Sequence, residues 1–238
     1  MESLRDVLLV IADISGYTHF MVATAKELSH GQAIITALLE AVLARAELPL
    51  LLAKLEGDAA FLYAIREPDG FPPDLGPRLL HFFDAFAEEL ARIGQAGVCD
   101  CTACRTAPQL RLKVVAHAGQ ALLHRTGGIE ELAGVDVIVV HRLLKNSVEA
   151  REYLLLTDAA ANQLAGLEDL RFERRTERYD ELGEVPVRVH LRGEQQREQA
   201  DRGWGGTSWV RRSLFAARWL ATLMRVRAGS RRVPEASM

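Results

Sequence analysis

The sequence predicts an α+β domain, an antiparallel-rich sheet with helices on one face. An apolar, β-branched run at residues 6–12 predicts a buried first strand, and hairpin patterns follow at residues 50–65 and 171–191. Between the two hairpins, apolar residues recur at helical spacing over residues 79–93. The chain has 238 residues, 49% of them hydrophobic, which is enough for one large domain with its own core and an appendage.

The other elements fill the gaps between these segments. We expect helices at residues 18–30 and 31–48, a strand pair at 110–118 and 121–124 around Gly119, a helix at 134–146, a strand at 153–157 and a short helix at 158–165. The resulting order is strand, helices, hairpin, helix, strand pair, helix, strand, short helix and hairpin.

Charge divides the chain into a body and a tail. The formal net charge is −3, but residues 203–238 carry seven arginines against one glutamate, so this segment is +6 and the remainder −9. We therefore expect a domain at 1–192, a polar linker at 193–207 and a basic amphipathic helix or tail at 208–238. Such a tail suits an anionic membrane surface or docking on a partner. Nucleic acid is not expected, because no groove-reading motif accompanies the tail.

The start of the chain lacks the basic residues and long apolar run of a signal peptide, and no stretch of 18 uncharged apolar residues occurs. We expect a cytoplasmic protein, with the tail as a means of reaching the inner face of the membrane.

Two apolar strands end in carboxylates at tight turns. The first runs through Val7–Ala12 into Asp13, and the second ends in Gly57 and Asp58. Side by side, these strand ends would form an oxygen-rich pocket for a hard divalent cation such as Mg²⁺. Alternatively, Asp13 caps a helix and Asp58 occupies a turn, where aspartate is common.

The motifs D-I-x-G-Y-T after the first strand and K-x-x-G-D in the hairpin resemble class III nucleotidyl cyclases, over residues 5–192. Other stretches, the C-x-C-x-x-C loop and the H-R-L-L-K-N helix, resemble a bacterial offshoot of that superfamily. The resemblance implies a ferredoxin-like cyclase fold in which Asp13 and Asp58 hold two Mg²⁺ or Mn²⁺ ions, with the Ile14 carbonyl as a further ligand. It also implies that Gly16, Tyr17 and Thr18, at the start of the next helix, bind the triphosphate.

The resemblance assigns three more residues. Lys54 and Glu131 would read the purine, a lysine accompanying adenine rather than guanine, so ATP is expected over GTP. Arg142 would stabilise charge on the transferring phosphate from the opposite protomer of a homodimer. Two positions depart from the pattern, because Ile138 replaces the asparagine that orients the ribose and Leu182 replaces a phosphate-binding lysine.

All three cysteines, Cys99, Cys101 and Cys104, lie in one C-x-C-x-x-C loop. Three thiolates fall one short of a structural zinc site, and His117 could supply the fourth ligand. His117 also fits an H-x-G turn of the cyclase strand, and the loop could instead bind an iron–sulfur cluster or hold reduced structural thiols.

Three functions remain open from the sequence. The first is a cyclase that converts ATP to cyclic AMP and pyrophosphate by two-metal catalysis. The second is a catalytically degenerate cyclase-like module that binds a nucleotide or dimerises in signalling. The third is a metal- or redox-sensing protein that uses the cysteine loop.

Overall fold

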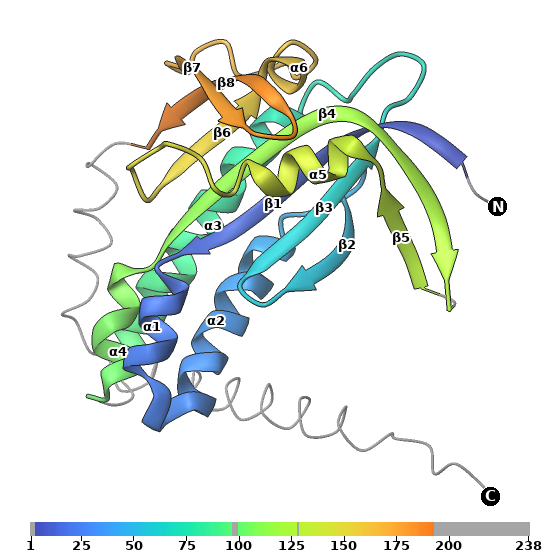
Figure 1. Cartoon of the computed structure of the whole chain (residues 1–238). Helices are drawn as coiled ribbons and strands as arrows, with labels where there is room; N and C mark the ends of the chain where they lie inside the picture. The colour runs from blue at the N-terminus through green and yellow to red at the C-terminus, as the bar shows by residue number, and fades with distance from the viewer. Residues whose placement is uncertain (1–2, 97–99, 128, 193–238) are drawn as a thin grey trace, which may run out of the picture.

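The computed structural model describes residues 3–96, 100–127 and 129–192 (Figure 1). The predicted linker at 193–207 and tail at 208–238 lie outside the described residues, as does Cys99. Among the described residues, no helix is both long enough and apolar enough to cross a membrane.

The described strands form one sheet in the order β2-β3-β1-β4-β6-β8-β7, with β5 paired to β4. Their bounds are β1 (Ser3–Ser15), β2 (Leu51–Glu56), β3 (Ala59–Ile65), β4 (Arg111–Thr126), β5 (Ile129–Ala133), β6 (Tyr153–Thr157), β7 (Glu173–Tyr179) and β8 (Gly183–Leu191). All pairings are antiparallel except that of β4 with β6.

The helices are short apart from two. Their bounds are α1 (Tyr17–Ala23), α2 (Leu28–Leu43), α3 (Leu75–Ala96), α4 (Thr102–Thr106), α5 (Val135–Arg142) and α6 (Asp158–Ala161), with 3₁₀ turns η1 (Ala25–Glu27) and η2 (Ala107–Gln109). The break between α1 and α2 lies at residues 24–27 rather than at the predicted 30/31 boundary. There, the Thr24 hydroxyl donates to the Phe20 carbonyl at 2.9 Å, beside the Thr24 N–H, and such a back-bond often bends a helix.

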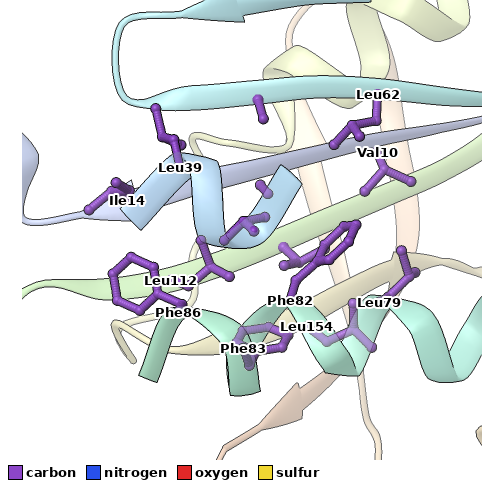
Figure 2. Close-up of a cluster of buried hydrophobic side chains, with 14 of the residues drawn as sticks. Val10, Ile14, Leu39, Leu62, Leu79, Phe82, Phe83, Phe86, Leu112 and Leu154 are labelled. Carbon is purple, nitrogen blue, oxygen red and sulfur yellow. The ribbon is translucent and has the colours of Figure 1, made fainter. Parts of the chain in front are cut away.

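Alternating residues of β1 bury both faces of the sheet. Leu8, Val10 and Ala12 belong to a large core against the long helices, where Phe82 and Phe86 of α3 fill the space (Figure 2). Each such fully buried aromatic or aliphatic side chain contributes about 1.5–3 kcal/mol. Val7, Leu9 and Ile11, on the other face of β1, belong to a second core under α5.

The predicted α+β class with an antiparallel-rich sheet is confirmed. Most helices cover one face as expected, whereas α5 crosses the opposite face, packed through Val139, Val140 and Leu143 (Figure 1). This single helix carries the predicted Arg142.

The predicted strand pair around Gly119 is wrong, because β4 continues through Gly119 as one long strand. Gly119 permits a close approach instead of a turn: a Cβ atom there would lie 2.3 Å from the Asp136 carboxyl group of α5. The strand that actually pairs with the end of β4 is β5.

Candidate functional site

The two predicted metal-binding carboxylates lie on β1 and on the adjacent turn between β2 and β3. Asp13 pairs with Ala59 across β1 and β3, and the Ile14 N–H donates to the Asp58 carbonyl at 3.2 Å. Partial burial and the nearby Asp13 charge raise the pKa of Asp58 to about 6. The sheet register therefore places Asp13 where its charge disfavours the ionised form of Asp58.

A lysine that sequence analysis did not single out neutralises this pair in part. Lys113 is the β4 partner of Asp13, and its Nζ lies 2.9 Å from Asp13 Oδ2. The same ammonium donates to the Leu144 carbonyl at 3.3 Å, just beyond the end of α5. The side chains of Lys113 and Asp13 are both largely buried. The available signal was a lysine within the otherwise apolar segment 112–116.

The donors at Asp13 and Asp58 suit a hard divalent cation, because carboxylate oxygens are the ligands Mg²⁺ prefers and a cation would relieve their repulsion. Lys113 supplies one positive charge at the same place. Divalent-ion binding would have to compete with this ammonium for Asp13.

The predicted triphosphate-binding segment follows directly. Gly16 has φ +91° and precedes α1, a helix of only seven residues. A Cβ atom at Gly16 would lie 2.1 Å from the Arg151 guanidinium, so that cation covers the turn. Tyr17 packs against the core under the helices, and Thr18 is exposed. The phosphate-binding roles of Gly16, Tyr17 and Thr18 remain predictions.

The predicted purine-reading residues lie near each other at the edge of the sheet. Lys54 forms an ion pair with Glu56 at 2.7 Å, and this contact, with smaller effects of the Glu56 and Glu131 charges, raises the pKa of Lys54. Glu56 also lies 3.2 Å from His141 Nε2, whose ring packs edge-on against Phe61. This chain of contacts joins α5 to β2.

Arg142 lies on the exposed side of α5, where it reaches Glu181 at 3.8 Å. With Arg178 and Leu182 of the β7–β8 hairpin, it lines a pocket of about 250 Å³. Leu182 stands in place of the expected lysine. Arg142 and Leu182 therefore line the same pocket, and Arg178 is a second arginine in it. Ile138, in place of the expected asparagine, is 49% exposed on the same helix.

Polar contacts anchor the end of α5. The Asn146 amide donates to the Leu143 carbonyl and the Tyr153 hydroxyl, both at 2.7 Å. The buried Glu177 accepts from the Ser147 N–H and hydroxyl. These contacts fix the segment that follows α5 and hold Asn146 in a structural role.

Cysteine and histidine side chains meet on the helical side of the sheet. Cys101 Sγ lies 3.2 Å from His30 Nδ1, and Cys104 Sγ lies 3.7 Å from His30 Nε2. The histidine beside the cysteines is therefore His30, which corrects the expectation of His117. His117 is buried within β4, where its two ring nitrogens contact Thr157 at 3.0 Å and Asp136 at 2.9 Å.

Glu27 organises the backbone around this cluster. Its carboxylate accepts the N–H groups of Ala103 at 3.1 Å and Thr102 at 3.4 Å, and these bonds lower the pKa of Glu27. Burial lowers the pKa of His30, which favours the neutral imidazole. Neutral imidazole is the form that binds metals.

Comparison with solved structures shows the fold. The catalytic core of a rhodopsin-guanylyl cyclase in complex with ATPalphaS is similar with a TM-score of 0.58 and 15% identity, covering 80% of this chain and 98% of that chain. The adenylyl cyclase CyaB from P. aeruginosa is similar with a TM-score of 0.58 and 12% identity, covering 82% of this chain and 98% of that chain. The protein thus has the fold of adenylyl and guanylyl cyclase catalytic domains.

Sequence comparison gives a curated relative and a family. The uncharacterized protein Rv2561/Rv2562 of Mycobacterium tuberculosis is 41% identical over 131 residues, which cover 53% of this chain and 58% of the relative. The chain therefore matches somewhat over half the length of that relative. The family model described as "Protein of unknown function (DUF2652)" matches residues 35–153, half of the chain. The protein therefore belongs to the DUF2652 family.

Proposed function

We propose that this protein is a nucleotidyl cyclase that converts ATP, in preference to GTP, to a cyclic nucleotide and pyrophosphate as a homodimer. The observation that carries the proposal is the proximity of Asp13 on β1 to Asp58 in the β2–β3 turn of a cyclase-type sheet, close enough for the Asp13 charge to act on Asp58. The raised pKa of Asp58 supports it, since perturbed carboxylates in pairs are typical of functional sites.

Mg²⁺ or Mn²⁺ held by these carboxylates, with the Ile14 carbonyl as a further donor, would activate the ribose 3′-hydroxyl and neutralise the α-phosphate. In the reaction, the 3′ oxygen bonds to the α-phosphorus while the bond from that phosphorus to the bridging oxygen breaks. Pyrophosphate leaves, and the hydroxyl proton passes to solvent. Asp13 and Asp58 would fix the position of the positive ions that neutralise the phosphate charge. The Lys113 ammonium neutralises Asp13 when no ion is bound.

Lys54 and Glu131 would select the base. A lysine ammonium can donate to adenine N1, and a carboxylate can accept from the adenine amino group. The Glu131 charge helps raise the pKa of Lys54, so the two side chains lie close enough to share this role. Lys54 would exchange its contact with Glu56 for one with the purine.

Arginines would bind the phosphates. Arg142 suits the transferring phosphate because a guanidinium binds two phosphate oxygens at once. Arg178, which lines the same pocket, would take the place of the lysine replaced by Leu182. Arg151, over Gly16, would add a cation beside the predicted triphosphate turn.

Exposed apolar side chains on two elements support the homodimer. Exposed apolar side chains lie on α5 and β2, the elements joined by His141 and Glu56. They are Val135, Ile138, Leu51, Leu52 and Leu55. A second copy of the chain packed against α5 and β2 would bury them and bring its Arg142 to the site.

A second candidate is nucleotide binding without turnover. The Lys113–Asp13 ion pair favours it, because a stationary ammonium on one carboxylate opposes the binding of divalent ions. The replacements at Ile138 and Leu182 favour it too, since loss of one preorganised phosphate contact costs about 10²–10³ in rate.

Mass spectrometry of the purified full chain with ATP or GTP and Mn²⁺ separates the two candidates. The cyclase proposal expects a cyclic product that is absent with Asp58→Ala. Saturable, Mn²⁺-dependent ATP binding without product would assign the second function. Calorimetry that detects no nucleotide binding would overturn both.

A further inference from the structure

Three side chains with metal-binding atoms converge from two distant parts of the chain. His30 lies in the first turn of α2, Cys101 precedes α4, and Cys104 lies within it. His30 and Cys101 are 71 positions apart in sequence. One ligand atom from each of the three residues can be chosen so that all lie within 4.8 Å of one another.

The distances suit one tetrahedral ion. With metal–sulfur bonds of about 2.3 Å and metal–nitrogen bonds of about 2.0–2.1 Å, sulfur and nitrogen ligands of zinc lie about 3.6 Å apart. Cys101 Sγ lies 3.2 Å from Nδ1 of His30 and Cys104 Sγ lies 3.7 Å from Nε2, so each sulfur is at about this separation from a different nitrogen of the same ring. Small rotations of the side chains would bring one imidazole nitrogen and both sulfurs onto a common centre.

The donor set selects the kind of metal. Thiolate sulfur and imidazole nitrogen favour zinc over Mg²⁺, Ca²⁺ or Mn²⁺, which prefer oxygen. The Cys104 N–H donates to Cys101 Sγ at 3.4 Å, a contact that stabilises a thiolate. Glu27 holds the backbone of Thr102 and Ala103 and so sets the position of the two cysteines around them.

We propose that His30, Cys101 and Cys104 bind one zinc ion that joins the start of α2 to α4. A fourth coordination position remains for water or another side chain. Among the elements near the cluster, α1 follows β1, which carries Asp13, and α4 precedes β4, which carries Lys113 (Figure 1). Zinc would therefore link α2, which follows β1 and α1 in the chain, to α4, which leads into β4, on the helical side of the sheet. This site does not depend on the proposed cyclase reaction.

Zinc content of the full-length protein provides the test. After treatment with a chelator and dialysis against Zn²⁺, elemental analysis should give about one zinc per chain. His30→Ala, Cys101→Ser and Cys104→Ser should each weaken zinc binding by at least about tenfold. His81→Ala, which removes an exposed histidine from α3, is the matched control and should bind zinc like the wild type.

Cys101→Ser is the sharpest variant. Cys101 caps α4 through its side chain, and serine is a strong capping residue, so this change keeps the cap while it removes a sulfur ligand. Replacement of zinc by Co²⁺ supplies a second readout, because tetrahedral cobalt with thiolate ligands shows visible d–d bands and a sulfur-to-cobalt charge-transfer band.

Two results would overturn the zinc site. One is a folded wild type that retains less than about 0.1 zinc per chain after loading and shows no cobalt–thiolate band. The other is a folded His30→Ala variant with wild-type zinc affinity. If circular dichroism shows that a variant does not fold, the cobalt spectrum of the wild type decides, and absence of the charge-transfer band rejects the site.

Discussion

The carboxylate site and the Cys/His cluster, defined by His30, Cys101 and Cys104, are built in different ways. Asp13 and Asp58 are placed by long strand ladders, since β1 pairs with β3 and β4 along most of its length. The Cys/His cluster is placed by the start of a helix and by α4, which has only five residues. Helices that short are marginal by themselves. The sheet can position its site before any ligand binds, whereas the cluster gains order from the ion it holds.

The two sites also differ in the chemistry of their ligands. The carboxylate site offers hard oxygen donors and already contains the Lys113 ammonium. The Cys/His cluster offers sulfur and nitrogen. Different ions are therefore expected to load them independently, and this independence can be tested by perturbing one site at a time.

Asp58→Asn should have the largest effect. It removes one carboxylate from the ion site, so Mn²⁺-dependent binding or turnover of ATP should fall by about 10²–10³. Zinc content should stay unchanged. Titration calorimetry with Mn²⁺ and ATP, beside elemental analysis, measures both. A variant that loses both metals together would contradict the independence of the two sites.

The same variant has a pH signature. The pKa of Asp58 is raised from 3.8 to about 6, so the folded state binds this proton more tightly than the unfolded state. Stability contributed by Asp58 therefore decreases as pH rises from about 4 through about 6. Thermal unfolding should show Asp58→Asn to be more stable than the wild type at about pH 7.5 and no more stable at about pH 4. Equal differences at both values would contradict the raised pKa of Asp58.

Removal of zinc should affect α4 and the start of α2 more than the rest of the fold. Free zinc at about 100 times its Kd would stabilise the fold by about 2.7 kcal/mol, which a chelator would abolish. Hydrogen exchange should accelerate in α4 and at the start of α2, with smaller changes in β1 and β4. His30→Ala without chelator should reproduce this pattern, and equal acceleration throughout the sheet would contradict a local brace.

Lys113→Met should separate stability from ion binding. It leaves Asp13 partly buried without its ion-pair partner, at a cost of about 1–3 kcal/mol in the free energy of unfolding. Mn²⁺ should bind more tightly, because the competing ammonium is gone. Denaturant unfolding and Mn²⁺ titration measure the two effects, and Lys26→Met, on an exposed 3₁₀ turn, is the control. Weaker Mn²⁺ binding by Lys113→Met would instead show that Lys113 assists ion binding.

Local patterns predicted the sheet well and its long-range contacts poorly. Apolar runs and turn residues located β1, the β2–β3 hairpin and β6 to within a few residues. Gly119 was misread because glycine serves both at turns and where a side chain approaches the backbone, and only the position of Asp136 distinguishes these.

The same limit applies to the sites. Asp13 and Asp58 could be linked because each ends a strand within a recognisable motif. Lys113 joins them through the β1–β4 register, and His30 meets Cys101 across 71 positions. Neither contact leaves a periodic signal in the sequence, because both arise from how distant elements pack.

Lys54→Glu should have the smallest effect, and it asks whether the carboxylate site extends to base selection. Lys54 is about half exposed, so loss of one hydrogen bond to adenine should cost about 0.5–1.5 kcal/mol. The change also places a third carboxylate near Glu56 and Glu131, which repels the acceptor N1 of adenine and suits the donor N1–H of guanine. The preference for ATP over GTP should fall about threefold to tenfold in competition binding with Mn²⁺. Lys26→Glu makes the same charge change at an exposed 3₁₀ turn and should leave the preference unchanged. If both variants weaken ATP and GTP equally, Lys54 contributes only general charge, and the purine must be read elsewhere.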